Sequence, residues 1–328
     1  MAGFARRALL AGIAGGIAST SPGMAQEAFP SRPLRLIVPY APGGTSDIMA
    51  RLIAGPLQTV LGQSVIVENR PGAGSLLGTE MVLRAPADGY TLLLADTPLT
   101  TVPTMQAAAG RPTPYEPARD FTPITQLGIA PAVLFATAAL PARSVPEFLA
   151  MAAARPDTVS IASSGVGSTT HLMAELLIGK SGARMAHVPY RGGGPALQDV
   201  AAGTVQATFL AWASGAALVQ SGLVRPLGIA AAQRLPDLPE VPTLREQGMD
   251  IVASFWWGLL APANLPRPVQ DRLVQAATLA MNAPEVQARL TTLSVQRAVA
   301  GPEAFRAHIA SESTTWAEVI RRAGLRAE

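Results

Sequence analysis

The sequence predicts an α/β fold, and two patterns carry this prediction. Short aliphatic and β-branched runs alternate along the chain with longer segments whose apolar residues recur at helical spacing. This alternation is typical of parallel strands covered by helices. The pattern restarts near Ser144, and in each half a Gly/Ser-rich turn joins an apolar strand to an amphipathic helix. We therefore expect the two halves to form similar α/β units.

The first half is predicted to begin with a strand at 34–38. A Pro/Gly loop follows, and a helix starts at Asp47, because the next apolar residues share one helical face. These residues are Ile48, Leu52, Ile53, Leu57 and Leu61. Pro56 lies inside this helix and is expected to kink it or to remove one backbone hydrogen bond. The remaining elements of this half are strands at 65–68 and 90–95 and a helix at 75–84.

The second half repeats the alternation of strands and helices. Its predicted elements are a helix at 144–154, a strand at 159–162, a helix ending at Lys180, strands at 185–188, 205–210 and 224–230, and a short helix after Pro242. Apolar stretches at 121–137 and 251–261 are interpreted as two crossovers between the halves. The last of two terminal helices has one apolar stripe, which is expected to pack on the first lobe. The stripe consists of Phe305, Ile309, Trp316 and Ile320.

The composition argues against several classes of function. The chain has 328 residues, of which 49% are hydrophobic and 14% charged, enough for a large core and for two domains. The formal net charge is only +3 and no basic run is present, so no nucleic-acid partner is expected. The sequence has no cysteine, and its three histidines lack metal-binding spacing. We therefore expect no disulfide, no metal site and no cofactor.

The first residues predict export. Arg6 and Arg7 precede an apolar run at 8–18, and a small-residue stretch ends at Ala25. This pattern is typical of a secretory signal peptide, here residues 1–25, that is cleaved after Ala25. The apolar run is too short for a bilayer span, which needs about 20 residues. The paired arginines also fit the twin-arginine export route.

Two loops form the candidate ligand site. Pro42-Gly-Gly-Thr-Ser-Asp47 lies between a predicted strand and a helix, and Ser163-Ser-Gly-Val-Gly-Ser168 has the same place in the second half. Unpaired amides and the positive end of the helix dipole meet at such corners, and glycine lets the backbone approach a ligand. Two facing corners would suit two carboxylates, or one carboxylate and another polar group. The alternative is that Asp47, or Ser168 and Thr169, only cap their helices.

Motifs of enzymes are weak in this sequence. Gly72-Ala-Gly-Ser-Leu-Leu-Gly78 has one residue too many for a dinucleotide-binding fingerprint. His171 lies one turn after Ser168 and could serve Ser164 as a base, so an exported hydrolase using Ser164 or Ser168 is one alternative. No orienting acid or oxyanion hole accompanies the pair, which favours a hydrogen-bonded histidine without a catalytic role. His187 is also interpreted as structural.

Stretches spread over nearly the whole chain resemble, in order, the substrate-binding proteins of tripartite tricarboxylate transporters, also called the Bug family. They are Phe29-Pro-Ser-Arg-Pro-Leu-Arg-Leu-Ile-Val-Pro-Tyr40, Pro42-Gly-Gly-Thr-Ser-Asp47 with Ala50-Arg51, Val67-Glu-Asn-Arg-Pro-Gly-Ala-Gly74, Asp88-Gly-Tyr-Thr-Leu-Leu93, Ser163-Ser-Gly-Val-Gly-Ser168 with His171-Leu172, Val188-Pro-Tyr-Arg-Gly-Gly-Gly-Pro-Ala-Leu197 and Leu238-Pro-Glu-Val-Pro-Thr243.

The resemblance implies a fold like that of type II periplasmic binding proteins, with two α/β lobes joined by two crossover segments and a ligand cleft between them. Lobe 1 would comprise residues 26–129 and 257–328, and lobe 2 residues 130–256. The implied function is capture of a di- or tricarboxylate or related organic acid in the periplasm and its delivery to the membrane subunits of a tripartite transporter. We expect a monomer that is not an enzyme. A sensory or orphan binding protein that signals to a membrane receptor is the alternative.

The resemblance also implies which residues bind the ligand. In the family, the loops corresponding to 40–47 and 163–168 grip carboxylates through backbone amides, hydroxyls and ordered water, and Tyr190 completes the cleft. The predicted ligand-binding residues are Tyr40, Gly43, Gly44, Thr45, Ser46, Asp47, Ser163, Ser164, Gly165, Gly167, Ser168, His171, Tyr190 and Gln206. Gln206 stands where the family usually has Asp. If its side chain reaches the cleft, a weaker preference for ligands with an ammonium group is expected.

Overall fold

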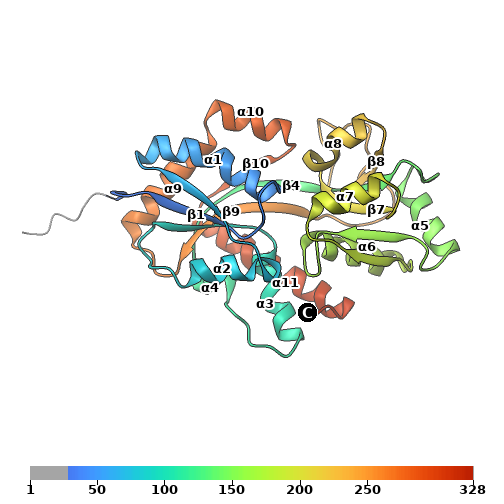
Figure 1. The fold of residues 1–328 in the computed structure, drawn as a ribbon, viewed down its shortest axis with the longest axis horizontal. Coiled ribbons are helices and arrows are strands. Elements are labelled where there is room, and N and C mark those ends of the chain that lie inside the picture. Colours follow the sequence, from blue (N-terminus) through green and yellow to red (C-terminus); the bar gives the residue numbers. More distant parts are fainter. Residues whose placement is uncertain (1–28, 328) are drawn as a thin grey trace, which may run out of the picture.

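The computed structural model describes residues 29–327. The predicted signal peptide at 1–25, and with it the predicted export route, lies outside these residues. The described chain forms two α/β lobes, joined by two long strands that pass from one lobe into the other (Figure 1). These strands are β4 (Phe121–Thr137) and β9 (Ser254–Pro262), and both lie within or overlap the stretches predicted as crossovers.

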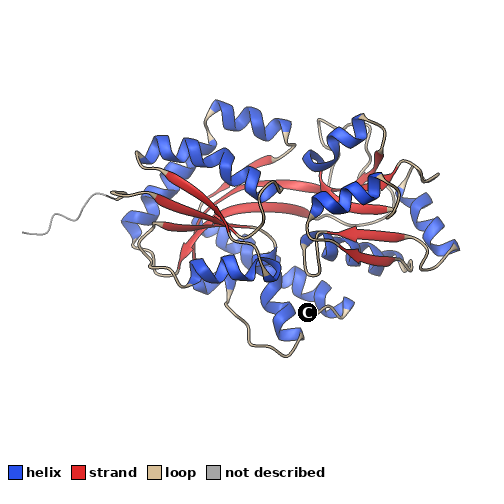
Figure 2. Cartoon of the chain, in the orientation of Figure 1, coloured by secondary structure: helices blue, strands red, loops and turns tan. Residues whose placement is uncertain are grey.

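Lobe 1 is built on three parallel strands, β1 (Leu34–Val38), β2 (Val65–Asn69) and β3 (Thr91–Ala95). Helices cover both faces of this sheet (Figure 2), so alternate residues of a strand enter different cores. In β3, Leu92 and Leu94 join one apolar cluster, whereas Leu93 and Ala95 join another. The other elements of lobe 1 are α1 (Thr45–Leu61), the 3-10 turn η1 (Ala73–Ser75), α2 (Leu76–Leu83), α3 (Pro98–Ala108), α4 (Pro117–Asp120), α9 (Arg267–Met281), α10 (Pro284–Thr292) and β10 (Gln296–Ala300).

Lobe 2 repeats the parallel arrangement. Its strands β5, β6 and β7 are parallel, and β8 pairs antiparallel with β4. Their bounds, with those of the helices of this lobe, are β5 (Ser160–Ser163), β6 (Ala186–Pro189), β7 (Ala207–Ala211), β8 (Val224–Ile229), α5 (Val145–Ala154), α6 (Thr169–Ser181), α7 (Gly193–Ala201) and α8 (Trp212–Gln220). The strands of both lobes form one sheet in the order β2-β1-β3-β9-β4-β7-β5-β6.

The predicted fold class is confirmed. α1 continues through Pro56 as one helix, and because proline has no N–H, the helix lacks the backbone hydrogen bond that this residue would donate, as expected. Two details differ from expectation. The sheet is mixed, because β4, β8, β9 and β10 run antiparallel to their partners. The short helix predicted after Pro242 is absent; Thr243 and Glu246 exchange the two hydrogen bonds of a capping box around a turn, with Glu246 N to Thr243 Oγ1 at 3.0 Å and Thr243 N to Glu246 Oε2 at 2.6 Å.

The last helix, α11 (Pro302–Ala323), packs on both lobes. Phe305 and Ile309 lie in an apolar cluster with residues of β1 and β3 of lobe 1, as predicted. Trp316 and Ile320 instead join the core of lobe 2, so the prediction that the whole stripe packs on lobe 1 is wrong. A 22-residue helix is about 33 Å long, which is enough to reach from one core to the next.

The predicted lobe boundaries, 129/130 and 256/257, fall inside β4 and β9, so each lies within a continuous strand. Where the lobes divide along these strands stays a prediction. None of the helices within residues 29–327 combines the length and the apolar character needed to cross a membrane.

Gly258 of β9 provides a test of how tightly α11 packs on the sheet. A Cβ atom at this position would overlap the ring of Phe305. We therefore expect Gly258→Ala to lower the free energy of unfolding by about 1–3 kcal/mol through overpacking. The measurement is urea unfolding followed by circular dichroism.

Gly55 offers the matched control. It lies within α1, and a Cβ there would meet no atom within 4 Å. Gly55→Ala is expected to raise the free energy of unfolding by about 0.5–1 kcal/mol, because alanine favours the helix. Equal effects of the two substitutions would contradict the packing described for Gly258.

Candidate functional site

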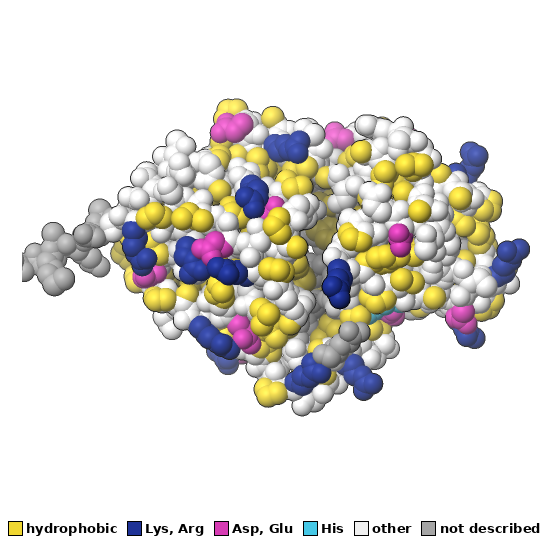
Figure 3. Space-filling view, viewed as in Figure 1, with side chains coloured by type: hydrophobic (Ala, Val, Ile, Leu, Met, Phe, Trp, Pro, Cys, Tyr) yellow, Lys and Arg dark blue, Asp and Glu magenta, His cyan; other side chains and the backbone are white. Residues whose placement is uncertain are grey.

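The two predicted loops lie on the same side of the molecule and face the gap between the lobes. Loop 1 (residues 40–47) leads from β1 into α1, and loop 2 (residues 163–168) leads from the end of β5 into α6. Both therefore lie at the carboxyl ends of parallel strands, where open α/β sheets bind ligands. Figure 1 shows the start of α1 and the loop before α6 at this gap, and Figure 3 shows that the surface is hollowed there. We call this hollow the cleft.

Contacts across the cleft link the lobes next to loop 2. Thr101 of α3, in lobe 1, places its hydroxyl 3.4 Å from the carbonyl oxygen of Gly167. A Cβ atom on Gly167 would lie 2.5 Å from Met105 Sδ, also in α3. Gly167 has a φ of +77°, which favours glycine. Glycine is therefore required at this position both by the backbone conformation and by the neighbouring helix.

Asp47 is used to fold loop 1. Its carboxylate accepts hydrogen bonds from Gly43 N at 3.0 Å, from Asn69 Nδ2 at 2.9 Å and from Arg51 Nε at 3.1 Å. Burial by itself would raise the pKa of Asp47, but these hydrogen bonds outweigh it and lower the pKa. With three protein donors on its two oxygens, Asp47 shapes the loop that a ligand would contact.

The start of α1 leaves main-chain donors open. Gly44 is the N-cap residue of α1, and no side chain caps this end of the helix. Gly43 and Gly44 are exposed, and a Cβ at either position would meet no atom within 4 Å. The first amides of a helix have no partner within the helix, and the helix dipole favours an anion beside them. Loop 1 can therefore hold a carboxylate through its backbone.

Asp96 is a site residue that the sequence reasoning missed. It follows the last residue of β3 and accepts hydrogen bonds from Tyr40 Oη at 2.6 Å and from Ser46 Oγ at 2.9 Å. Trp257 of β9 donates from Nε1 to the same Ser46 oxygen at 3.1 Å. Burial raises the pKa of Asp96 to about 6. The available signal was an acidic residue directly after a buried strand that neighbours β1.

Loop 2 uses most of its side chains internally. The fully buried Ser163 hydroxyl accepts from Gly165 N at 3.1 Å. Ser168 caps α6: its hydroxyl accepts from His171 N at 3.3 Å and donates to Gly165 O at 2.7 Å. Ser164 N donates to Thr170 Oγ1 at 2.7 Å. Ser168 therefore caps α6, which is the alternative role that the sequence allowed for it.

The two histidines near loop 2 hold its shape. The buried ring of His171 accepts from Gly167 N at Nδ1, at 3.1 Å. It stacks on the ring of His187 with centroids 3.8 Å apart, and His187 Nε2 lies 2.7 Å from Ser163 Oγ. Burial, with the neighbouring His171, lowers the pKa of His187 to about 4. Because Nδ1 of His171 is occupied by the backbone, this nitrogen is not available as a base for Ser164.

A second helix start with open amides lies beside loop 2. α7 begins at Gly193, and its N-cap residue Gly192 provides no side-chain cap. A Cβ on Gly193 would lie 3.4 Å from Ser164 Oγ, so the two loops adjoin. Tyr190, at the head of this loop, donates its hydroxyl to Asp199 Oδ2 at 2.7 Å. In lobe 2, open main-chain donors are thus provided by the start of α7, whereas α6 is capped by its own serine.

The structure contradicts the prediction for Gln206. Its carboxamide oxygen accepts from Ser160 N at 2.9 Å and from Ser160 Oγ at 2.8 Å. Ser160 is the first residue of β5, whereas loop 2 leaves from the last, about 10 Å further along the strand. Gln206 therefore joins β5 to β7 at the edge away from loop 2. The expected effect of Gln206 on ammonium ligands loses its basis.

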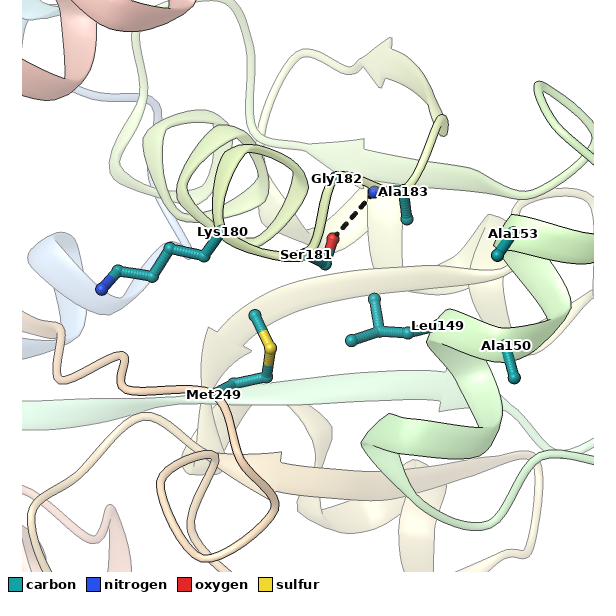
Figure 4. A pocket seen from close by; sticks show the side chains of 8 residues that line it. All are labelled: Leu149, Ala150, Ala153, Lys180, Ser181, Gly182, Ala183 and Met249. Atoms are coloured by element: carbon teal, nitrogen blue, oxygen red, sulfur yellow. Dashed lines mark hydrogen bonds between the residues drawn. The ribbon is translucent and has the colours of Figure 1, made fainter.

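Another hollow lies on lobe 2, away from both loops. Figure 4 shows it between α5 and the end of α6; its lining residues are Leu149, Ala150, Ala153, Lys180, Ser181, Gly182, Ala183 and Met249. Its side chains are mostly apolar, and the chain of Lys180 extends away from the others. Within residues 29–327, no group of three or more His, Asp or Glu side chains is arranged to hold a metal ion.

Comparison with known proteins identifies the family. The family model described as "Tripartite tricarboxylate transporter family receptor", TctC, matches residues 49–325. A UPF0065 protein from the tcbD-tcbE intergenic region of Pseudomonas sp. strain P51 is 36% identical over 98% of this chain and 95% of its own length. The protein BugT of Bordetella pertussis is 35% identical over 91% of each chain.

Solved structures agree with this assignment. The periplasmic binding protein BugD superposes with a TM-score of 0.83 at 32% identity, covering 91% of this chain and 99% of its own. An R. palustris protein solved with adipate superposes with a TM-score of 0.84 at 31% identity, and the match covers 91% of this chain and 99% of that protein. MatC from Rhodopseudomonas palustris, solved with bound malate, superposes with a TM-score of 0.80 at 32% identity, and the match covers 89% of this chain and 100% of MatC. The chain therefore belongs to the TctC, or Bug, family of periplasmic solute-binding proteins, which are not enzymes.

Proposed function

We propose that this protein captures a small organic carboxylate in the cleft and delivers it to the membrane subunits of a tripartite tricarboxylate-type transporter. One observation carries the proposal: the uncapped start of α1, with its exposed glycines, lies at the cleft opposite the uncapped start of α7. A carboxylate is the kind of group that such helix starts hold. The relatives solved with malate and adipate, both dicarboxylates, support this class of ligand.

The contacts suggest two kinds of role for the predicted site residues. We propose that the ligand meets main-chain amides and hydroxyls at the surface of the cleft, while a second set of residues fixes the loops. The first set is Gly44 and Thr45, through their main-chain amides, the hydroxyl of Ser164 and the start of α7; the second set is Tyr40, Gly43, Ser46, Asp47, Ser163, Gly165, Gly167, Ser168, His171 and Tyr190. Gln206 belongs to neither set, because Ser160 occupies its side chain.

Closure of the two lobes on the ligand follows from this division of the site. Each lobe contributes part of the binding surface, so the ligand stabilises the arrangement in which both parts are close. β4 and β9 are the only strands of the described chain that belong to both lobes. We propose that the lobes move about these strands. One chain supplies both walls of the cleft, so a monomer, which we propose as the form in the periplasm, contains the complete site.

A panel of organic acids tests the proposed function. The exported protein should gain thermal stability with at least one di-, tri- or hydroxycarboxylate, because the ligand binds the folded state only. At a ligand concentration of 100 times Kd the expected gain is about 2.7 kcal/mol. Differential scanning fluorimetry measures the shift, and mass spectrometry of molecules released from freshly purified protein identifies the natural ligand. Absence of any shift across the panel would count against the proposal.

Thr45 tests whether the start of α1 binds the ligand carboxylate. Thr45 is the first residue of α1, and Thr45→Glu adds a negative charge where the ligand charge is proposed to lie. We expect affinity for the best carboxylate to fall at least about ten-fold, or about 1.4 kcal/mol. The unliganded variant should remain as stable as wild type, because an acidic residue in the first turn favours the helix by about 0.3–1 kcal/mol.

Thr45→Gln is the matched control, since it has a similar size without the charge. Its affinity, measured by isothermal titration calorimetry, should stay within about three-fold of wild type. Unchanged affinity in Thr45→Glu would place the ligand carboxylate elsewhere.

A further inference from the structure

We infer that Asp96 determines which carboxylates this protein accepts: it selects a ligand that carries an ammonium group besides its carboxylate and disfavours a plain dicarboxylate. The inference rests on the proposed function and names the substrate class within it. Nothing in the sequence pattern of the two loops indicates this preference, because Asp96 lies outside both.

Asp96 lies at the edge of the lobe 1 sheet from which loop 1 leaves. β3 is the parallel neighbour of β1, and Asp96 follows β3 as loop 1 follows β1. Its two carboxylate oxygens contact one residue at each end of loop 1, Tyr40 at 2.6 Å and Ser46 at 2.9 Å. The residue is partly exposed, although its carboxylate is desolvated enough to raise its pKa. A ligand held by the start of α1 would have Asp96 as a neighbour.

The charge of Asp96 is not balanced by a cation. None of the ion pairs found within residues 29–327 includes it. The titratable groups that face Asp96 are Tyr40 and Tyr115. Burial and the charge of Asp96 raise the pKa of both tyrosines, so both stay neutral at pH 7.

An unpaired carboxylate has opposite effects on the two classes of ligand. A second ligand carboxylate near Asp96 would meet a like charge, which disfavours binding. A ligand ammonium would supply the missing opposite charge and form a charge-assisted hydrogen bond. Each carboxylate oxygen has two acceptor positions, and the protein side chains fill one on each. Asp96 therefore retains the capacity to accept from a ligand.

Two buried hydroxyls near Asp96 have no protein partner. They are Oγ1 of Thr97, the next residue in the chain, and Oη of Tyr115. Thr97 as a whole is 0% exposed and Tyr115 is 3% exposed. A buried hydroxyl without a partner is unfavourable by about 1–3 kcal/mol. The surroundings of Asp96 thus contain polar groups beyond those that fold the loops.

Protonation of Asp96 should reverse the selectivity. Burial raises the pKa of Asp96 to about 6. Above this pH the group is charged and favours an ammonium; below it the group is neutral, can donate a hydrogen bond and tolerates a second carboxylate. Binding of plain dicarboxylates should therefore strengthen as the pH falls through about 6, and binding of amino acids should weaken.

The experiment compares matched ligands by isothermal titration calorimetry on the full exported protein. The sets are succinate, aspartate and 4-aminobutanoate; glutarate, glutamate and 5-aminopentanoate; and adipate with 6-aminohexanoate. At pH 7.5, one amine-bearing ligand should bind at least about ten-fold more tightly than the dicarboxylate of its set. Asp96→Asn should remove this advantage, and the affinity for the dicarboxylate should be unchanged or higher.

Asp237→Asn is the control, because Asp237 is exposed on lobe 2 and the change of charge is the same. It should preserve the wild-type ratio. A second measurement needs no variant: the affinity of wild type for the best amine-bearing ligand should fall at least about five-fold between pH 7.5 and pH 5, as Asp96 becomes protonated, because the ligand ammonium and carboxylate keep their charges over this range. This second measurement decides the matter if Asp96→Asn does not fold.

The outcomes separate this inference from the proposed function. If dicarboxylates bind at least as tightly as their amine-bearing partners at pH 7.5, or if Asp96→Asn leaves the preference for an amine-bearing ligand unchanged, the inference is overturned and the proposed function stands. If no organic acid binds at either pH, both are overturned.

Discussion

The antiparallel pairing of β4 with β9 is the constraint on which the rest of the structure depends. The ladder runs from Phe121 opposite Pro262 to Pro131 opposite Ser254, and both strands continue the sheets of the two lobes. Because the lobes share these strands, the carboxyl ends of their parallel strands are held facing one gap. Two helix starts that would otherwise be ordinary strand-to-helix corners thereby become the two parts of the proposed ligand site.

The two walls of the cleft are built by different means. In lobe 1, Asp47 binds Gly43, Arg51 and Asn69, so the amides at the start of α1 stay open. In lobe 2, Ser168 caps α6, and the uncapped helix start is that of α7. In both loops the conspicuous polar side chains fold the backbone, and we propose that the amides left open at the starts of α1 and α7 meet the ligand. A site of this kind recognises negative charge without an arginine or lysine.

Asp96 gives the cleft a feature that a purely anion-binding site would lack. The start of α1 favours negative charge, whereas the carboxylate of Asp96 beside it favours positive charge. Tyr40 and Ser46 hold Asp96 from both ends of loop 1 and so fix its position relative to the start of α1. Trp257, on the crossover strand β9, donates a hydrogen bond to Ser46. The position of Asp96 therefore depends on one of the strands that join the lobes.

The sequence by itself determined the elements and the loops, because these depend on local chemistry. The strand at 34–38 and the two Gly/Ser-rich corners follow from apolar periodicity and from turn residues, and they occur where expected. Only the tertiary structure decided which groups remain free to bind. Gln206 and Asp96 are both polar residues next to a buried strand, yet Ser160 occupies Gln206 while Asp96 faces loop 1. The ends of α11 likewise separate into two cores although its sequence shows one stripe. Which partner binds a polar side chain, and which core an apolar side chain enters, depends on residues distant in sequence. The periodicity of one segment contains no information about these residues.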